Sequence, residues 1–73
     1  MKPTVGRIVH YWVVDPYGNV VPRAAIITHV WSDECVNLHV FGDGTFGGED
    51  QKITSVVKTE ANNPMSWSWP ERV

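Results

Sequence analysis

The chain has 73 residues, which is enough for one small domain and too short for two, so a single domain over 1–73 is expected. Hydrophobic residues make up 42% of it and charged residues 19%, which supports a small core and excludes a disordered tail. Six Lys and Arg against eight Asp and Glu leave a formal net charge of −2. This balance argues against a protein that coats a nucleic-acid polymer.

Cys35 is the single cysteine, so no internal disulfide is possible and no thiol cluster can hold a structural zinc ion. The first residues carry no apolar run of signal-peptide length, and no run approaches the roughly 18 apolar residues of a membrane span. These features predict a cytoplasmic protein with no membrane attachment and no cofactor. Because a core this small supplies little net stability, a homo-oligomer is also expected.

Runs of apolar, β-forming residues predict three strands in the first half of the chain. The first spans 5–14 and ends at the turn-forming run 15–19. The second spans 23–31, and after a polar break at 32–34 the third spans 35–41. The short polar break predicts that the second and third strands form a hairpin.

The second half of the chain predicts two further strands. A glycine-rich, acidic loop over 42–50 precedes a strand over 53–59. A short fifth strand is expected within 65–70, where Pro70 stops any continuing ladder. Five short strands without a helical period indicate an all-β domain, and a five-stranded SH3-like barrel is the most economical closure. The alternatives are a strongly bent antiparallel sheet and a flat meander completed by pairing with another copy.

Period-two alternation predicts which residues share a face of each strand. In the third strand Val36, Leu38 and Val40 lie on one face. In the second strand strict alternation separates Ile27 from Val30, and in the fifth it places Met65, Trp67 and Trp69 together.

Catalytic signatures are missing from the sequence. Cys35 follows Asp33 and Glu34, whose negative charge would raise the pKa of a thiol and make it less reactive. The three histidines, His10, His29 and His39, lie in apolar runs without the spacing of metal ligands. Each is interpreted first as a packing residue, with donation to a phosphate or base edge, metal binding and a role in a small nucleotide hydrolase as the alternatives.

Four tryptophans are many for so short a chain, and Trp67 and Trp69 lie close to its end. They fit two roles equally: filling the core, or stacking on a flat ligand such as a nucleobase. Arg7, Arg23 and Arg72 offer guanidinium groups that can pair with one or two phosphates without making the surface basic. The alternative for each arginine is a solvated charge or a surface ion pair.

Three segments carry a family resemblance: Val5-Gly6-Arg7-Ile8-Val9-His10-Tyr11, then Val36 to Phe41 with Asp43-Gly44, and the closing Trp67-Ser68-Trp69-Pro70-Glu71-Arg72-Val73. Together they resemble small single-domain proteins encoded by bacteriophages and prophages. The closing W-x-W-P-x-R is the most specific element. The resemblance points to the anti-CBASS sponge group, which sequesters the cyclic nucleotide messengers of bacterial defence inside the infected cell.

The resemblance implies a non-enzymatic homo-oligomer that binds a cyclic dinucleotide such as 3'3'-cGAMP in the bacterial cytoplasm. Stacking would then fall to Tyr11, Trp67 or Trp69. Phosphate contacts would fall to Arg7, Arg23 or Arg72, with His39 as a further donor. These assignments follow from side-chain chemistry, since no binding motif of the group maps onto the chain residue by residue.

A second hypothesis assigns the domain to a protein-interaction module. Tyr11, Trp12, Trp31 and Phe41 would then form an apolar groove for a host or virion protein. The two hypotheses differ in ligand chemistry, because the first requires an anion and the second does not.

Overall fold

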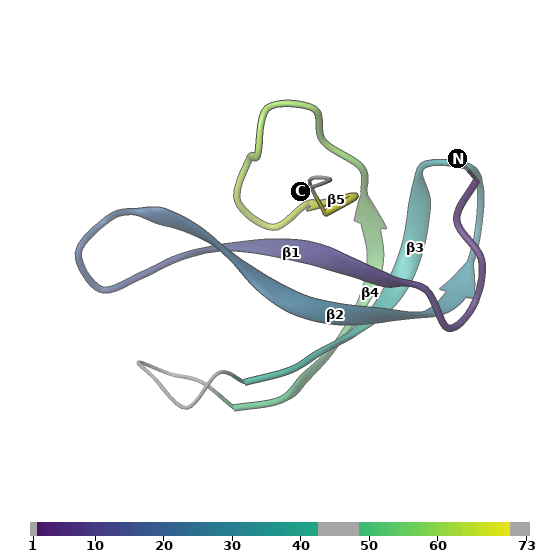
Figure 1. Cartoon of the computed structure of the whole chain (residues 1–73), viewed down its shortest axis with the longest axis horizontal. Helices are drawn as coiled ribbons and strands as arrows, with labels where there is room; N and C mark the ends of the chain where they lie inside the picture. Colours follow the sequence, from purple (N-terminus) through teal and green to yellow (C-terminus); the bar gives the residue numbers. More distant parts are fainter. Residues whose placement is uncertain (1, 43–48, 71–73) are drawn as a thin grey trace.

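The computed structural model describes residues 2–42 and 49–70 (Figure 1). Within these residues it is an all-β domain whose five antiparallel strands form one sheet. The strands are β1 (Ile8–Val14), β2 (Val20–Val30), β3 (Cys35–Val40), β4 (Gln51–Val57) and β5 (Trp67–Ser68). Their order across the sheet is β4-β3-β2-β1-β5. The all-β prediction is confirmed, and no helix that could cross a membrane occurs in the described part of the chain.

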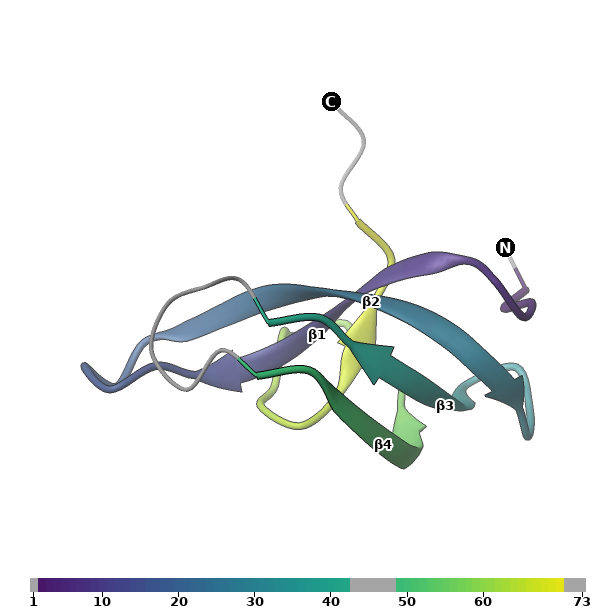
Figure 2. The same cartoon turned by 90° about the horizontal axis from the view of Figure 1, so that it is seen from below.

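The sheet is strongly bent, so that its edge strand β5 meets the end of the opposite edge strand, β4. Figure 1 shows the β1–β2 hairpin crossing β3 and β4 at a steep angle, with β5 beside the crossing, and Figure 2 shows the same sheet from below. Just after β4, Lys58 forms a parallel bridge with Trp67, and the Thr59 N–H donates to the Trp67 carbonyl at 2.8 Å. The bend therefore brings the last strand between β1 and the end of β4.

The β1–β2 turn is fixed by Asp15. Its Oδ1 accepts hydrogen bonds from the backbone N–H groups of Tyr17 and Asn19 at 2.9 and 2.8 Å. Gly18 has φ +86°, which glycine adopts without a Cβ penalty. Because this turn closes over only five residues, pairing starts at once with Val14 opposite Val20.

Strand β2 therefore begins three residues earlier than predicted and includes Pro22. Proline lacks the N–H that a central strand must donate, so the sequence favours a later start. Pro22 is tolerated because this end of β2 pairs with β1 alone, while β3 pairs only from Ala25 onwards. Strand β3 ends at Val40, one residue before the predicted end at Phe41. The Phe41 N–H still donates to the Ala24 carbonyl of β2 at 2.9 Å.

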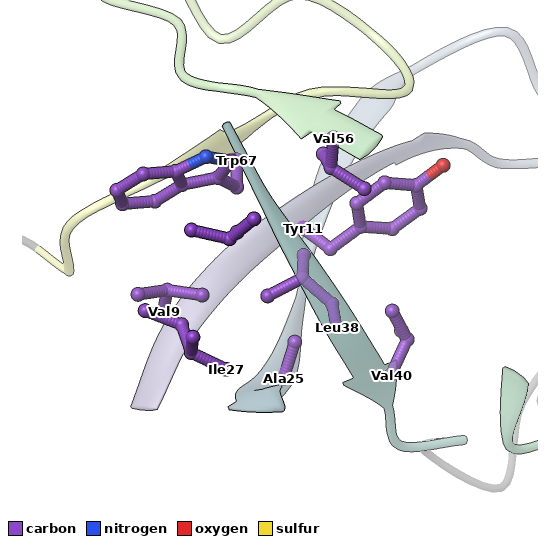
Figure 3. Close-up of a cluster of buried hydrophobic side chains, with 9 residues drawn as sticks. Val9, Tyr11, Ala25, Ile27, Leu38, Val40, Val56 and Trp67 are labelled. Carbon is purple, nitrogen blue, oxygen red and sulfur yellow. The ribbon is translucent and has the colours of Figure 1, made fainter. Parts of the chain in front are cut away.

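Nine buried side chains form the core on the concave side of the sheet (Figure 3): Val9, Tyr11, Ala25, Ile27, Val36, Leu38, Val40, Val56 and Trp67. The prediction that Val36, Leu38 and Val40 share a face is confirmed, since all three are buried. Burying these side chains removes apolar surface from water, which is the main favourable contribution to folding.

Two register shifts break the strict alternation. One lies between Ile27 and His29, so Val30 packs against the same core as Ile27, which corrects the prediction that they face opposite ways. The other lies between β3 and β4, and its extra residue is in β4. There Ser55 has φ +55°, and its N–H donates to Asn37 Oδ1 at 2.9 Å. A bulge inserts one residue and reverses the facing of all that follow.

The fifth strand is shorter than the predicted segment. Met65 has φ +64° and is exposed, so it does not share a face with Trp67 as alternation suggested. Strand β5 consists of Trp67 and Ser68, paired with Tyr11 and His10 of β1.

Candidate functional site

A pocket of about 480 Å³ opens where the outer face of β1 meets the C-terminal segment. Its lining residues are His10, Trp12, Pro22, Asn62, Ser68, Trp69 and Pro70. We call this the Trp12–Trp69 pocket. Ligand pockets in proteins span roughly 300–1,000 Å³ and are mostly apolar with a few polar groups, and this one fits that description.

Strand register brings the lining together. Trp12 lies opposite Pro22, and His10 lies opposite Ser68, so their side chains project from the same outer face of the sheet. The Trp12 indole Nε1–H donates to Ser68 Oγ at 2.8 Å, which fixes the ring against β5. The His10 and Trp12 rings meet edge to face with centroids 6.0 Å apart.

Trp69 forms a second aromatic wall of the pocket. Its ring is half-buried and packs edge to face against Trp67, with centroids 5.3 Å apart and an interplanar angle of 84°. Its indole Nε1–H is buried and has no hydrogen-bond partner among the described residues. A buried donor without a partner is destabilising by about 1–3 kcal/mol, so an acceptor supplied here would be favourable.

The polar groups of the pocket are neutral. Ser68 accepts from Trp12 and keeps its own hydroxyl proton free to donate, and Asn62 offers both a carbonyl and an amide. Asn62 comes from the loop between β4 and β5 and has φ +54°, a conformation that asparagine adopts more readily than most residues. No Asp, Glu, Lys or Arg occurs among the described lining residues.

Of the residues proposed from sequence for the site, Trp69 lines the pocket. Trp67 and Tyr11 lie in the core instead: Trp67 is fully buried, and burial raises the pKa of the Tyr11 hydroxyl. Neither side chain lines the Trp12–Trp69 pocket, so the proposed stacking there falls to other rings. Of the two roles open to Trp67, the structure assigns core packing, with Nε1 donating to the Glu34 carbonyl at 2.9 Å.

The predicted phosphate ligands are dispersed. Arg7 is exposed just before β1, and Arg23 is half-buried on the core-facing side of β2, opposite Tyr11. Neither lines the Trp12–Trp69 pocket. Arg72 lies outside the described residues.

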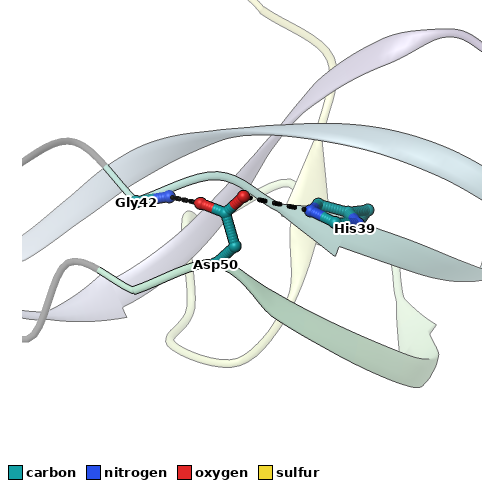
Figure 4. A network of polar contacts seen from close by, with 3 residues as sticks. All are labelled: His39, Gly42 and Asp50. Atoms are coloured by element: carbon teal, nitrogen blue, oxygen red, sulfur yellow. Dashed lines mark hydrogen bonds and ion pairs between the residues drawn. The ribbon is translucent and has the colours of Figure 1, made fainter.

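His39 belongs to a separate polar network beside the end of β3 and the start of β4 (Figure 4). Its Nε2 lies 3.3 Å from Asp50 Oδ2, and Asp50 Oδ1 accepts the Gly42 N–H at 2.8 Å. These two contacts, the Gly42 hydrogen bond first, lower the pKa of Asp50. The network connects the end of β3 to the residue before β4, and none of its members lines the pocket.

Each histidine ring lies against the aromatic ring two positions later. The ring centroids are 4.4 Å apart for His29 and Trp31 and 5.0 Å apart for His39 and Phe41. Among the described residues, no three His, Cys, Asp or Glu side chains are placed to hold a metal ion. The sequence repeats a His-x-aromatic pattern, and in a strand this spacing puts both residues, such as His10 and Trp12, on one face. This spacing is the one sequence signal that indicates the pocket. Asn62 enters the lining from the loop between β4 and β5, and no sequence pattern indicates its place there.

A scan against family models and searches of curated proteins and of solved structures return no match to this chain.

Proposed function

We propose that this protein binds a nucleotide through the Trp12–Trp69 pocket and holds it without cleaving it. The observation that carries the proposal is a base-sized pocket walled by two indoles beside two neutral hydrogen-bonding groups, Asn62 and Ser68. Base-on-aromatic stacking contributes about 1–3 kcal/mol per base, and it needs no charge on the protein.

The hydrogen-bonding groups suit the edge of a base. The Ser68 hydroxyl donates, and the Asn62 amide both donates and accepts, as the edges of purines require. Rotation of the Trp69 indole would offer its unpartnered N–H to a base acceptor as well. Arg72 follows Pro70 by two residues in the sequence and is the phosphate-pairing residue of the proposal.

The sequence resemblance supplies the biological form of the proposal. A chain of this kind would act in the cytoplasm of a phage-infected bacterium as an oligomeric sponge. It would sequester a cyclic oligonucleotide defence signal such as 3'3'-cGAMP.

A second candidate is a module that binds proline-rich peptides. The observation favouring it is that Pro22, Pro70 and the two indoles line the same uncharged pocket. Extended proline-rich segments dock into aromatic-lined grooves of this kind. A neutral peptide would use the same rings without needing a phosphate partner.

A thermal-shift panel on the full chain separates the candidates. The panel contains cyclic di- and trinucleotides, cyclic ADP-ribose isomers, mononucleotides and a proline-rich peptide. A ligand present at 100 times its Kd stabilises the fold by about 2.7 kcal/mol. For a domain of this size that raises Tm by more than about 10 °C. Recovery of the ligand intact after heat denaturation checks that it is not turned over. A flat response to every nucleotide refutes the proposal.

Asn62→Asp sharpens the test, because it adds a carboxylate to the pocket at nearly constant shape and tolerates the same backbone conformation. At about 7 Å from a phosphate and an effective dielectric of about 50, the repulsion is about 1 kcal/mol. A nucleotide should therefore bind about fivefold more weakly, and a neutral peptide should be unaffected. Asn63→Asp, on the neighbouring residue outside the lining, is the matched control.

A further inference from the structure

The outer face of the β1–β2 hairpin is a continuous uncharged surface. It consists of four cross-strand pairs: Ile8 with Ile26, His10 with Ala24, Trp12 with Pro22, and Val14 with Val20. We call these eight residues the β1–β2 outer face. None of them is Asp, Glu, Lys or Arg, and the one such residue in β1 or β2, Arg23, projects from the opposite side.

Much of this surface is exposed to solvent. Ile8 is 61% exposed, Val14 54% and Val20 40%, and Phe41 adjoins them from the end of β3. Figure 1 shows the end of the hairpin that carries Val14 and Val20 projecting away from the rest of the domain. Scattered exposed apolar residues need no explanation, but a contiguous set of them marks an interaction surface.

We propose that a second copy of this chain covers the β1–β2 outer face in a two-fold symmetric dimer. In such a contact each surface meets its own equivalent, so the surface must be self-complementary. An uncharged apolar face meets this condition, because it sets no like charges opposite one another. A partner recognised through charge would find none on these eight residues.

The dimensions of the face suit a small interface. A seven-residue strand is about 24 Å long, and two neighbouring strands span about 10 Å. The flat footprint of the β1–β2 outer face is thus about 230 Å², and projecting side chains make its accessible area larger. Stable interfaces bury roughly 800 Å² per partner, so a dimer that depends on protein concentration is expected.

The dimer would also complete the pocket, and this part rests on the proposed function. His10, Trp12 and Pro22 belong both to the β1–β2 outer face and to the Trp12–Trp69 pocket. A second copy seated on the face would lie over the pocket mouth and contribute a wall. Nucleotide binding and dimerisation would then strengthen each other.

Sedimentation velocity on the full chain, from low micromolar to submillimolar concentration and without ligand, tests the inference. The wild-type chain should self-associate, and Val14→Lys should raise its dissociation constant at least about tenfold by burying a charge in the contact. Val57→Lys is the matched control, because Val57 is a strand valine of nearly the same exposure, 55% against 54% for Val14, on β4 at the far edge of the sheet from β5. Monomeric behaviour throughout, or equal effects of the two variants, would overturn the inference.

An NMR measurement on the wild-type chain avoids dependence on variants. In a mixture of isotope-labelled and unlabelled copies, filtered NOEs should connect the methyl groups of Val14 and Val20 across the two chains. Their absence from a sample shown to be dimeric would place the contact elsewhere and refute the inference. A dimer that binds no nucleotide would refute the proposed function alone, and a monomer that binds one would refute the dimer alone.

Discussion

Replacing Trp67 by phenylalanine should destabilise the domain far more than the same change at Trp31. The Trp67 ring is fully buried, and its Nε1 donates to the Glu34 carbonyl at 2.9 Å. That carbonyl also accepts the Lys58 N–H at 2.8 Å, so it keeps one partner in the variant. The loss therefore combines one hydrogen bond with the buried area of the larger ring.

The magnitude follows from these two contributions. The hydrogen bond contributes about 1 kcal/mol net, and removing about two methylene equivalents of buried ring costs about 1.6 kcal/mol. The Trp67→Phe variant should lose about 2–3 kcal/mol of the roughly 4–11 kcal/mol expected for 73 residues. For a domain of this size Tm then falls by about 10–20 °C.

Trp31→Phe is the control because that indole also donates a hydrogen bond, to Asn37 Oδ1 at 2.8 Å, but lies 60% exposed. Water replaces the lost bond, so the change should stay within about 0.5 kcal/mol. Urea unfolding followed by far-UV circular dichroism gives both values without relying on tryptophan fluorescence. Equal, small losses in the two variants would refute the placement of Trp67 in the core.

Two further predictions concern single contacts. Ser68→Ala removes the acceptor of the Trp12 indole and should lower the free energy of unfolding by about 1 kcal/mol. Trp12→Phe should destabilise the Ser68→Ala variant less than it destabilises the wild type, and a double-mutant cycle measured by urea unfolding detects this difference. Because the folded pKa of Asp50 lies below its usual value of 3.8, the stability from its contacts with Gly42 and His39 is present above that value and lost as pH falls through the folded pKa. Urea midpoints between pH 2 and 6 should therefore fall less for Asp50→Asn than for the wild type, and parallel curves would contradict this.

Most of the sheet was predictable because its strands carry local patterns. The third strand reads as alternating valine and leucine, and the polar break before it predicts the hairpin with β2. The turn around Asp15 and Gly18 was predictable from turn chemistry. The sequence did not predict which face residues beyond a bulge occupy, because a bulge of one residue does not change the local composition. Val30 shows this: alternation puts it on the opposite face from Ile27, but it packs against the same core.

The candidate site was only partly predictable. Trp67 and Trp69 were both candidates because they lie close to the end of a tryptophan-rich chain, and both follow a serine, yet only Trp69 lines the pocket. The difference arises from long-range contacts, the bridge from Lys58 and the hydrogen bond to Glu34, which place Trp67 between β1 and β4. Asn62 enters the pocket through a loop, and no periodic pattern can indicate such a residue.

The most direct test of the Trp12–Trp69 pocket uses the four indole N–H groups as separate reporters. A 15N-labelled chain is titrated with the nucleotide that gives the largest thermal shift, and the indole resonances are followed. The Trp12 and Trp69 signals should move together and saturate with the ligand, while exposed Trp31, which does not line the pocket, should stay in place. Movement of Trp31 with Trp12 and Trp69 unchanged would contradict the account.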